Sequence, residues 1–385
     1  MNKIFSFMGA RKILFGRGSF ERLGECLKEL KGARPFVVVD PGLESAGIAK
    51  DIERVLSAVG LHAVLFSDFR PEPFLESVDG GARRARKEKC DIVVGIGGGS
   101  AMDMAKAIAV VATNGGKSVE YLGLNQIPAP GLPKIMVPTT AGTGSEVTFT
   151  SVFVRKDLKK KQGMNSPFLY PEIALLDPCL TLTAPPDVTA ATGLDALCHA
   201  IESFTSINSN PMSELLSLEA IGLIAENLRT CVHEGKNLDA REAQLLGSLY
   251  AGLGLANAGV TAVHSLSYPL GGKYGVPHGL ANTILLPAVM RYNLPGAVDK
   301  FAIVADAMGE VGDGLSLREQ AEMAVEAVGI LIEDCGILST LADVGVLEED
   351  FEELAGIAMT VARPLENNPR KITPKEAVEI YRDAF

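Results

Sequence analysis

One carboxylate and three imidazoles stand at spacings that suit a metal ion. Asp195 and His199 are four residues apart, and His264 and His278 follow fourteen apart, so that three of the five histidines belong to this set. On a helix an i, i+4 pair lies on one face about 6 Å apart, close enough to share an ion. Oxygen and imidazole ligands suit Fe²⁺, Zn²⁺, Mn²⁺ or Co²⁺. The alternative is a helix-terminal charge and three histidines with structural or surface roles.

The residues around this pair predict a buried helix with one polar stripe. On a helical wheel Asp195, His199 and Glu202 share a narrow face, whereas Leu194 and Leu197 belong to an apolar arc. Glu202 can then accept a hydrogen bond from a ligand imidazole, as carboxylates beside metal-bound histidines commonly do. An ordinary salt bridge is the alternative for this carboxylate.

A first glycine-rich turn upstream has the composition of a phosphate-binding loop. It follows an expected strand over 92–96 and opens a helix. Glycines let the backbone approach a pyrophosphate, and the amides at the start of a helix receive its charge. The residues assigned to this turn are Gly97, Gly98, Gly99, Ser100 and Asp103. A tight structural turn is the alternative, because the run is neither G-x-G-x-x-G nor a Walker loop.

A second turn, over 138–148, also follows an expected strand and is crowded with hydroxyl groups. Such side chains supply donors and acceptors for ribose and phosphate oxygens. The residues that we expect to contact a dinucleotide here are Thr139, Thr140, Thr143 and Ser145. A surface turn without a ligand rarely needs so many hydroxyls.

The elements that carry these residues divide the chain into two kinds of sequence. Before residue 185, apolar runs alternate with helical stretches, and strands are expected at 36–39, 63–66, 92–96, 135–137 and 173–176. This alternation indicates a parallel sheet covered on both faces. Later segments are almost wholly helical, with helices expected at 213–228, 240–255, 317–335, 348–362 and 374–384. We therefore expect an α/β dinucleotide-binding domain over 1–185 and an all-α, metal-binding and catalytic domain over 186–385.

Composition limits the classes of partner. A chain of 385 residues with 47% apolar residues can form two cores. A net charge of −11 argues against binding to nucleic acid or an anionic membrane surface, since both need a basic footprint. The six cysteines contain no Cys-x-x-Cys pair, and no apolar run approaches the length of a membrane span. We expect a soluble, unprocessed protein in a reducing cytoplasm.

Together these motifs resemble the iron-containing (group III) alcohol dehydrogenase family. The likeness rests on the order and spacing of both glycine turns, the Asp195/His199 helix and the segment from His264 to His278. The run from Tyr274 to Asn282 resembles a second family signature, and the likeness covers essentially the whole chain. It implies the two-domain, dehydroquinate synthase-like fold, with a Rossmann-like nucleotide lobe.

The resemblance also implies a reaction and its cofactors. Asp195, His199, His264 and His278 would bind Fe²⁺, with Zn²⁺ possible in purified protein because affinity rises toward zinc. The metal would act as a Lewis acid while hydride passes between a small primary alcohol or aldehyde and C4 of the nicotinamide of NAD(H). Lys161 and Leu180 join the glycine-turn residues as expected cofactor contacts, although Lys161 could instead end a solvated hairpin tip. A homodimer or higher homo-oligomer is implied as well.

Asp40 is expected to select NAD over NADP. It ends the strand over 36–39, where a nucleotide lobe places the group that meets the adenosine ribose. A carboxylate there accepts hydrogen bonds from ribose hydroxyls but repels a 2′-phosphate. The alternative is that Asp40 only opens the turn at Pro41-Gly42.

Two positions depart from the family pattern or bear on the substrate. Tyr268 stands four residues after His264, where many members have a histidine near the nicotinamide. It is the catalytic residue that we expect to donate or relay a proton, with a wall residue as the alternative. Leu255 and the segment from Arg363 to Leu365 align with positions that line the alcohol pocket, and Leu255, where some members have a bulky aromatic residue, suggests a somewhat roomier pocket. If the pocket is neutral and small, it favours C3 to C5 alcohols and aldehydes; Arg363 or Lys273 could instead admit an anionic tail.

Three functions remain open at this point. The first is the NAD-dependent, metal-containing dehydrogenase. The second is a metalloenzyme of the dehydroquinate synthase or glycerol dehydrogenase type. The third is a relative that binds a nucleotide without turnover.

Overall fold

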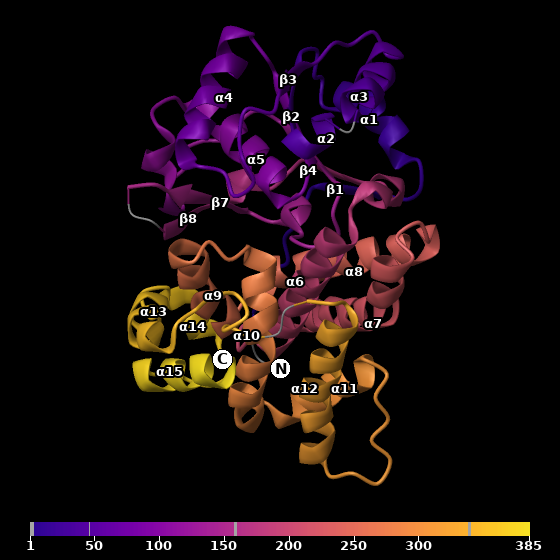
Figure 1. Cartoon of the computed structure of the whole chain (residues 1–385). Coiled ribbons are helices and arrows are strands. Elements are labelled where there is room, and N and C mark those ends of the chain that lie inside the picture. Colours follow the sequence, from indigo (N-terminus) through magenta and orange to yellow (C-terminus); the bar gives the residue numbers. More distant parts are fainter. Residues whose placement is uncertain (1–3, 46, 158–159, 338–339) are drawn as a thin grey trace. The chain divides into compact units, whose positions relative to one another are not determined.

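The computed structural model describes residues 4–45, 47–157, 160–337 and 340–385. The chain forms two compact units (Figure 1). One is Gly9–Thr183, and the other is Ala184–Phe385 together with the N-terminal residues up to Met8. Compactness does not test independent folding, so the domain boundary after residue 185 stays a prediction.

A parallel six-stranded sheet forms the centre of the first unit, in the order β1-β9-β6-β4-β2-β3. Its strands are β1 (Lys12–Phe15), β2 (Pro35–Val39), β3 (Val64–Phe66), β4 (Ile92–Gly97), β6 (Lys134–Pro138) and β9 (Ile173–Leu176). All five strands predicted from apolar runs are present. The short edge strand β1 was not predicted, although its residues Ile13 to Phe15 are apolar; none of its four residues is fully buried.

Helices cover both faces of this sheet. The helices are α1 (Leu23–Glu29), α2 (Pro41–Ser45), α3 (Ile48–Ser57), α4 (Leu75–Lys87) and α5 (Gly99–Asn114). Successive strand residues point to opposite faces, so Phe36 and Val38 share a core with α4 and α5. Val37 and Val39 instead pack in a second core with α1 and α3. The predicted doubly covered parallel sheet is confirmed.

A small second sheet in the same unit was not predicted. It comprises β5 (Gly123–Leu124), β7 (Thr150–Arg155) and β8 (Lys160–Asn165), with β7 and β8 antiparallel. The apolar run in β7 is only three residues long, from Val152 to Val154, and charged residues follow it, which obscures the strand pattern in the sequence. This hairpin brings Lys161 toward the segment that precedes α4, because Phe74 pairs with Val154.

The second unit is helical throughout its described residues. Its helices are α6 (Pro186–Thr205), α7 (Pro211–His233), α8 (Leu238–Ala258), α9 (Ala262–Lys273), α10 (His278–Asn293), α11 (Val298–Ala307), α12 (Leu317–Asp334), α13 (Phe351–Ala358), α14 (Ala362–Asn367) and α15 (Pro374–Asp383). One hydrophobic core joins them. The helix predicted over 348–362 is confirmed over α13 but ends early, at Ala358, because the helical conformation is interrupted before α14.

One bent helix pair in this unit has the length and apolar composition of a membrane span. Among the described residues no single helix has the length and apolar character of a membrane span, and α8 with α9 reaches it only across a bend of 103°.

Candidate functional site

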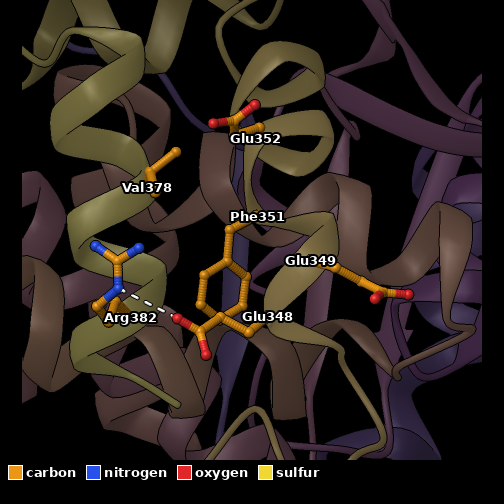
Figure 2. Close-up of a pocket in the computed structure, with 6 residues that line it drawn as sticks. All are labelled: Glu348, Glu349, Phe351, Glu352, Val378 and Arg382. Carbon is orange, nitrogen blue, oxygen red and sulfur yellow. Dashed lines mark ion pairs between the residues drawn. The ribbon is translucent and has the colours of Figure 1, made fainter.

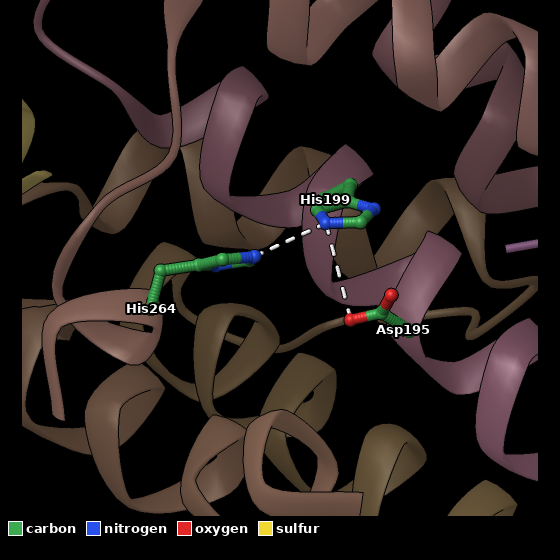
Figure 3. Close-up of side chains that lie close together, drawn as sticks. All are labelled: Asp195, His199 and His264. Atoms are coloured by element: carbon green, nitrogen blue, oxygen red, sulfur yellow. Dashed lines mark hydrogen bonds and ion pairs between the residues drawn. The ribbon is translucent and has the colours of Figure 1, made fainter. Parts of the chain in front are cut away.

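Three helices bring the predicted metal ligands together. Asp195 and His199 lie on α6, His264 lies in the first turn of α9, and His278 begins α10. The donor atoms of Asp195, His199 and His264 all lie within 4.8 Å of one another, and all three residues are buried (Figure 3). The predicted i, i+4 pair is therefore joined by a histidine that is 65 residues away from His199.

The distances within this group fit a shared divalent ion. His199 Nε2 and His264 Nε2 are 3.1 Å apart, and His199 Nε2 is 3.9 Å from Asp195 Oδ1. Two nitrogens bound to one metal at about 2.1 Å lie roughly 3.0–3.5 Å apart. Carboxylate and imidazole donors in a buried position match the set that binds Fe²⁺ or Zn²⁺. The residues present therefore fit a metal.

Glu202 fixes the orientation of His264 and the start of α9. One oxygen, Oε1, accepts hydrogen bonds from Thr261 N (2.9 Å), Thr261 Oγ1 (2.8 Å) and Val263 N (2.9 Å). The other, Oε2, forms a short hydrogen bond with His264 Nδ1. A proton on Nδ1 leaves the lone pair on Nε2, the nitrogen that faces Asp195 and His199. Glu202 is thus the imidazole acceptor that the helical stripe suggested.

Electrostatics in this group stabilise the charged forms. Burial opposes ionisation of Asp195 and Glu202, but the histidines around each carboxylate outweigh burial and hold its pKa below the usual range. Burial opposes protonation of His264 as well, and the carboxylates of Glu202 and Asp195 nevertheless raise its pKa. The site therefore attracts positive charge, whether a proton or a metal ion.

A second group of donors beside this one is built for hydrogen bonding rather than for a metal. Cys198, Glu202 and His264 also place donor atoms within 4.8 Å. However, burial and the nearby carboxylates raise the pKa of Cys198 well above its ordinary value, so the thiolate that a metal needs is disfavoured. In addition, Glu202 Oε1 already accepts three hydrogen bonds from residues at the start of α9.

Asn282 links the remaining ligand to the group. Its Nδ2 donates to Asp195 Oδ1 at 2.7 Å and lies 3.3 Å from His278 Nε2. The rings of His264 and His278 have centroids 5.2 Å apart. Asn282 follows His278 by one helical turn, a spacing that could have identified it from the sequence.

Tyr268 lies one turn after His264 on α9. Its side chain is half-buried, and its ring centroid is 5.9 Å from that of His278. The phenol is thus close to the proposed ligands, as expected for a proton donor or for a wall of the site. Its part in proton transfer stays a prediction.

The two glycine turns come together at the start of α5. Gly98 precedes the helix, and a β-carbon on it would lie 3.4 Å from Thr140 Oγ1. A β-carbon on Gly99 would lie 2.7 Å from Thr143 Cγ2, and Thr139 N donates to Gly97 O at 3.0 Å. The threonine loop therefore packs directly against the turn. The hydroxyls of the loop and the amides at the start of the helix therefore lie close together, and their contact with an anionic ligand stays a prediction.

Asp103 and Ser145 are engaged with each other. Ser145 Oγ donates to Asp103 Oδ1 at 2.6 Å, and Val152 N donates to Asp103 Oδ2 at 2.8 Å. Lys106, which is fully buried, donates to Ser145 O at 3.0 Å and lies 3.2 Å from Asp103 Oδ1. These contacts give both residues a structural role in holding the threonine loop. Their contact with a cofactor stays a prediction.

Asp40 and Leu180 both lie beyond the carboxyl ends of strands of the same sheet, after β2 and β9 respectively. Asp40 Oδ1 accepts a hydrogen bond from Gly42 N at 2.9 Å, and a β-carbon on Gly97 would lie 2.8 Å from Asp40 Cβ. The carboxylate therefore both opens the turn and adjoins the first glycine turn. Leu180, in the 3₁₀ helix Pro178–Thr183, packs against the core of α1 and α3.

Lys161 is not a solvated hairpin tip. Its side chain is 9% exposed, and Nζ lies 2.6 Å from Glu72 Oε1. The hairpin alternative for this lysine was wrong, because β8 pairs along its length with β7 and turns Lys161 inward. Sequence reasoning missed Glu72, which lies 89 residues from its partner and belongs to no motif.

A separate pocket lies on the helical unit (Figure 2). The residues that line it are Glu348, Glu349, Phe351, Glu352, Val378 and Arg382. An ion pair of 3.5 Å between Arg382 and Glu348 crosses it. None of the predicted ligands lines this pocket, so it is not part of the proposed metal site.

Comparison with known proteins agrees with this fold. The family model described as "Iron-containing alcohol dehydrogenase" matches residues 10–178. The model described as "Fe-containing alcohol dehydrogenase family, C-terminal" matches residues 189–385. The 1,3-propanediol dehydrogenase of Citrobacter freundii is 40% identical over 386 residues, which cover 100% of this chain and 99% of that protein.

Solved structures agree as well. A crystal structure of 1,3-propanediol oxidoreductase has a TM-score of 0.97 with 39% identity and covers 100% of both chains. The sulfoacetaldehyde reductase of Bifidobacterium kashiwanohense, solved in complex with NAD⁺, has a TM-score of 0.89 with 31% identity and covers 100% of this chain and 99% of that one. A parallel nucleotide-type sheet in one unit and a buried aspartate–histidine group in the helical unit are the features expected of a metal-dependent dehydrogenase. The chain belongs to the iron-containing alcohol dehydrogenase family.

Proposed function

We propose that this protein is an NAD-dependent, metal-containing alcohol dehydrogenase that interconverts small primary alcohols and aldehydes. The observation that carries the proposal is the convergence of Asp195, His199 and His264 on a space of metal-ligand dimensions. Relatives named for propanediol and sulfoacetaldehyde chemistry support an alcohol or aldehyde substrate. They do not favour the synthase or non-catalytic alternatives.

We assign distinct tasks to the residues of the helical unit. Asp195, His199, His264 and His278 would hold the metal, Glu202 would keep the Nδ1 proton on His264, and Asn282 would steady Asp195 by its hydrogen bond. When bound, the metal supplies a Lewis acid and NAD(H) supplies the hydride acceptor or donor. Tyr268 is assigned to donate a hydrogen bond to the reacting oxygen and to pass its proton toward solvent.

The first unit would hold the cofactor. The turn from Gly97 to Ser100 at the start of α5 would receive the pyrophosphate, and Thr139, Thr140 and Thr143 would contact it from the adjoining loop. Asp40 would accept hydrogen bonds from the adenosine ribose, which favours NAD over NADP. Asp103, Ser145, Lys161 and Leu180 complete the proposed cofactor contacts.

We propose iron as the working metal, a reducing cytoplasm as the compartment, and a homodimer or larger homo-oligomer as the assembly. Six free cysteines are compatible with a reducing compartment. A family defined by iron, and ligands of oxygen and nitrogen, support Fe²⁺, although zinc suits the same donors.

Absorbance of NADH with a panel of short aldehydes tests the function. Protein reconstituted with Fe²⁺ should oxidise NADH with C3 to C5 aldehydes, and chelator-treated protein should not. An Asp195→Asn variant with intact secondary structure serves as the matched control and should be inactive. Equal NADH oxidation by the reconstituted and metal-free proteins would contradict the proposal.

A further inference from the structure

Glu72 and Lys161 form an ion pair in the first unit. The two residues are far apart in the sequence, and the fold brings their side chains together. The 2.6 Å contact joins a side chain that is 9% exposed to one that is 30% exposed. Lys161 lies on β8, and Glu72 lies between β3 and α4. A lysine buried to this degree needs a counter-charge, and Glu72 supplies it.

The backbone at Glu72 is held in an unusual conformation beside the first glycine turn. Glu72 has φ +52°, in the left-handed region that residues with a β-carbon adopt at an energetic cost. Its N–H donates to Ser100 Oγ at 3.2 Å, and Val154 N donates to Pro73 O at 2.9 Å. The segment is thus tied to α5 on one side and to β7 on the other. Such strain persists only where the surroundings determine the conformation.

Two exposed cations lie over the ring of the nearby Phe74, although the chain carries a net charge of −11. Lys156 Nζ lies 3.9 Å and Arg70 Cζ 4.8 Å from the centroid of the Phe74 ring, two residues after Glu72. Cations near the start of a helix favour an anionic ligand. Glu72 is the counter-ion of a third cation in this part of the unit, the buried Lys161.

We propose that Glu72 competes with the cofactor for Lys161. In the cofactor-free protein the carboxylate holds the lysine, and on binding the lysine exchanges it for a phosphate or ribose oxygen of the dinucleotide. The competition weakens binding and speeds release, a step that limits turnover in many enzymes. This inference rests on the proposed use of NAD(H).

Titration of the purified protein with NADH, followed by fluorescence, tests the competition in the absence of substrate. Glu72→Gln removes the charge, and Glu72→Asn also suits the left-handed backbone, which asparagine tolerates better than glutamate. Both variants should bind NADH about 3- to 10-fold more tightly at low ionic strength, through slower dissociation. The gain should shrink in high salt, because screening weakens the competing carboxylate.

Two further variants separate the proposed exchange from a general charge effect. Glu76→Gln removes an exposed carboxylate four residues away, on α4, and should leave NADH affinity unchanged. In a Lys161→Met background, Glu72→Gln should give a much smaller gain. An equal gain in that background would overturn the competition, because Glu72 would then act without Lys161.

The remaining outcomes are also decisive. Unchanged affinity in Glu72→Gln and Glu72→Asn would overturn the inference, and weaker binding in both would show that Glu72 itself binds the cofactor. If the wild-type protein binds no NADH, the proposed function fails and the competition with it. Thermal melts of each variant without cofactor establish that it is folded.

Discussion

The Nε2 atoms of His199 and His264 face each other at 3.1 Å, although the two residues are 65 positions apart in the chain. Two acceptor lone pairs at this distance repel unless a proton or a metal ion lies between them. Glu202 holds the proton of His264 on the opposite nitrogen. The folded chain therefore presents a space that a cation would stabilise.

Removal of the acid group of Glu202 should weaken metal binding. In Glu202→Gln the amide can donate to His264 Nδ1, which moves the ring proton to Nε2 and blocks the ligand position. Loss of such a partner typically costs 10- to 100-fold, roughly, in metal affinity. Competition with a chromophoric chelator measures this change. Glu219→Gln, on the exposed face of α7, should bind metal as the wild type does, and wild-type affinity in Glu202→Gln would reject the role of Glu202.

Substitution of Gly98 should impair the cofactor site without damage to the fold. Gly98 has φ −75°, which alanine adopts readily, and the nearest atom to its new β-carbon is Thr140 Oγ1 at 3.4 Å. The methyl group would occupy the space that we assign to the pyrophosphate. Gly98→Ala should keep its melting temperature and lose about tenfold or more in NADH affinity. Gly80→Ala, on α4, is the control, and normal NADH binding by Gly98→Ala would place the phosphates elsewhere.

Replacement of Tyr268 by Phe tests its hydroxyl. If the phenol donates a hydrogen bond to the reacting oxygen, kcat should fall roughly ten- to a thousandfold, the range for a positioned acid or base. Metal content should not change, because Tyr268 is not one of the proposed ligands. Equal kcat values for the two proteins would make the ring a wall of the site only.

Substitution of Asp40 tests cofactor choice. Asp40→Gly removes the repulsion of a 2′-phosphate, so kcat/KM with NADP should rise by about 30-fold or more relative to NAD. The hydrogen bond to Gly42 N is lost as well, which should lower stability slightly. An unchanged ratio of NAD to NADP turnover would show that Asp40 only stabilises the turn and does not select the cofactor.

Glu146 should make stability depend on pH. Burial raises its pKa from 4.5 to about 7, and its Oε1 has no hydrogen-bond partner within the described parts of the chain. Because the folded protein binds this proton more tightly than the unfolded chain, the contribution is full below about pH 4.5 and is lost as pH rises through about 7. The whole effect is roughly 3 kcal/mol.

Glu146→Gln measures this contribution. The variant should melt close to the wild type at pH 5 and at a clearly higher temperature at pH 8, where the wild type must bury a charged carboxylate. A variant that is less stable than the wild type at pH 8 would show that the charge is compensated by Lys106.

Local sequence patterns predicted the elements and contacts that depend on nearby residues. The apolar run over 92–96 correctly predicted the strand β4. The i, i+4 spacing correctly predicted that the side chains of Asp195 and His199 lie close together on one helix. Contacts between distant segments left no such trace. Glu202 and His264 are 62 residues apart, and their hydrogen bond depends on how α6 packs beside the start of α9.

The same reasoning explains the errors. Lys161 has the sequence surroundings of a solvated turn, yet β7 and Glu72 bury it. The helix expected over 348–362 ends early, at Ala358, and a separate helix, α14, starts at Ala362. These outcomes depend on tertiary packing, which the local pattern does not contain.

Metal analysis tests the central claim most directly. The wild-type protein and His264→Ala are reconstituted with Fe²⁺ under reducing conditions, desalted and examined by elemental analysis, with His233→Ala at the exposed end of α7 as the control. The wild type and His233→Ala should retain iron at close to one ion per chain, and His264→Ala should retain almost none while its circular dichroism stays native. Stoichiometric iron in His264→Ala would contradict the assignment of the metal site.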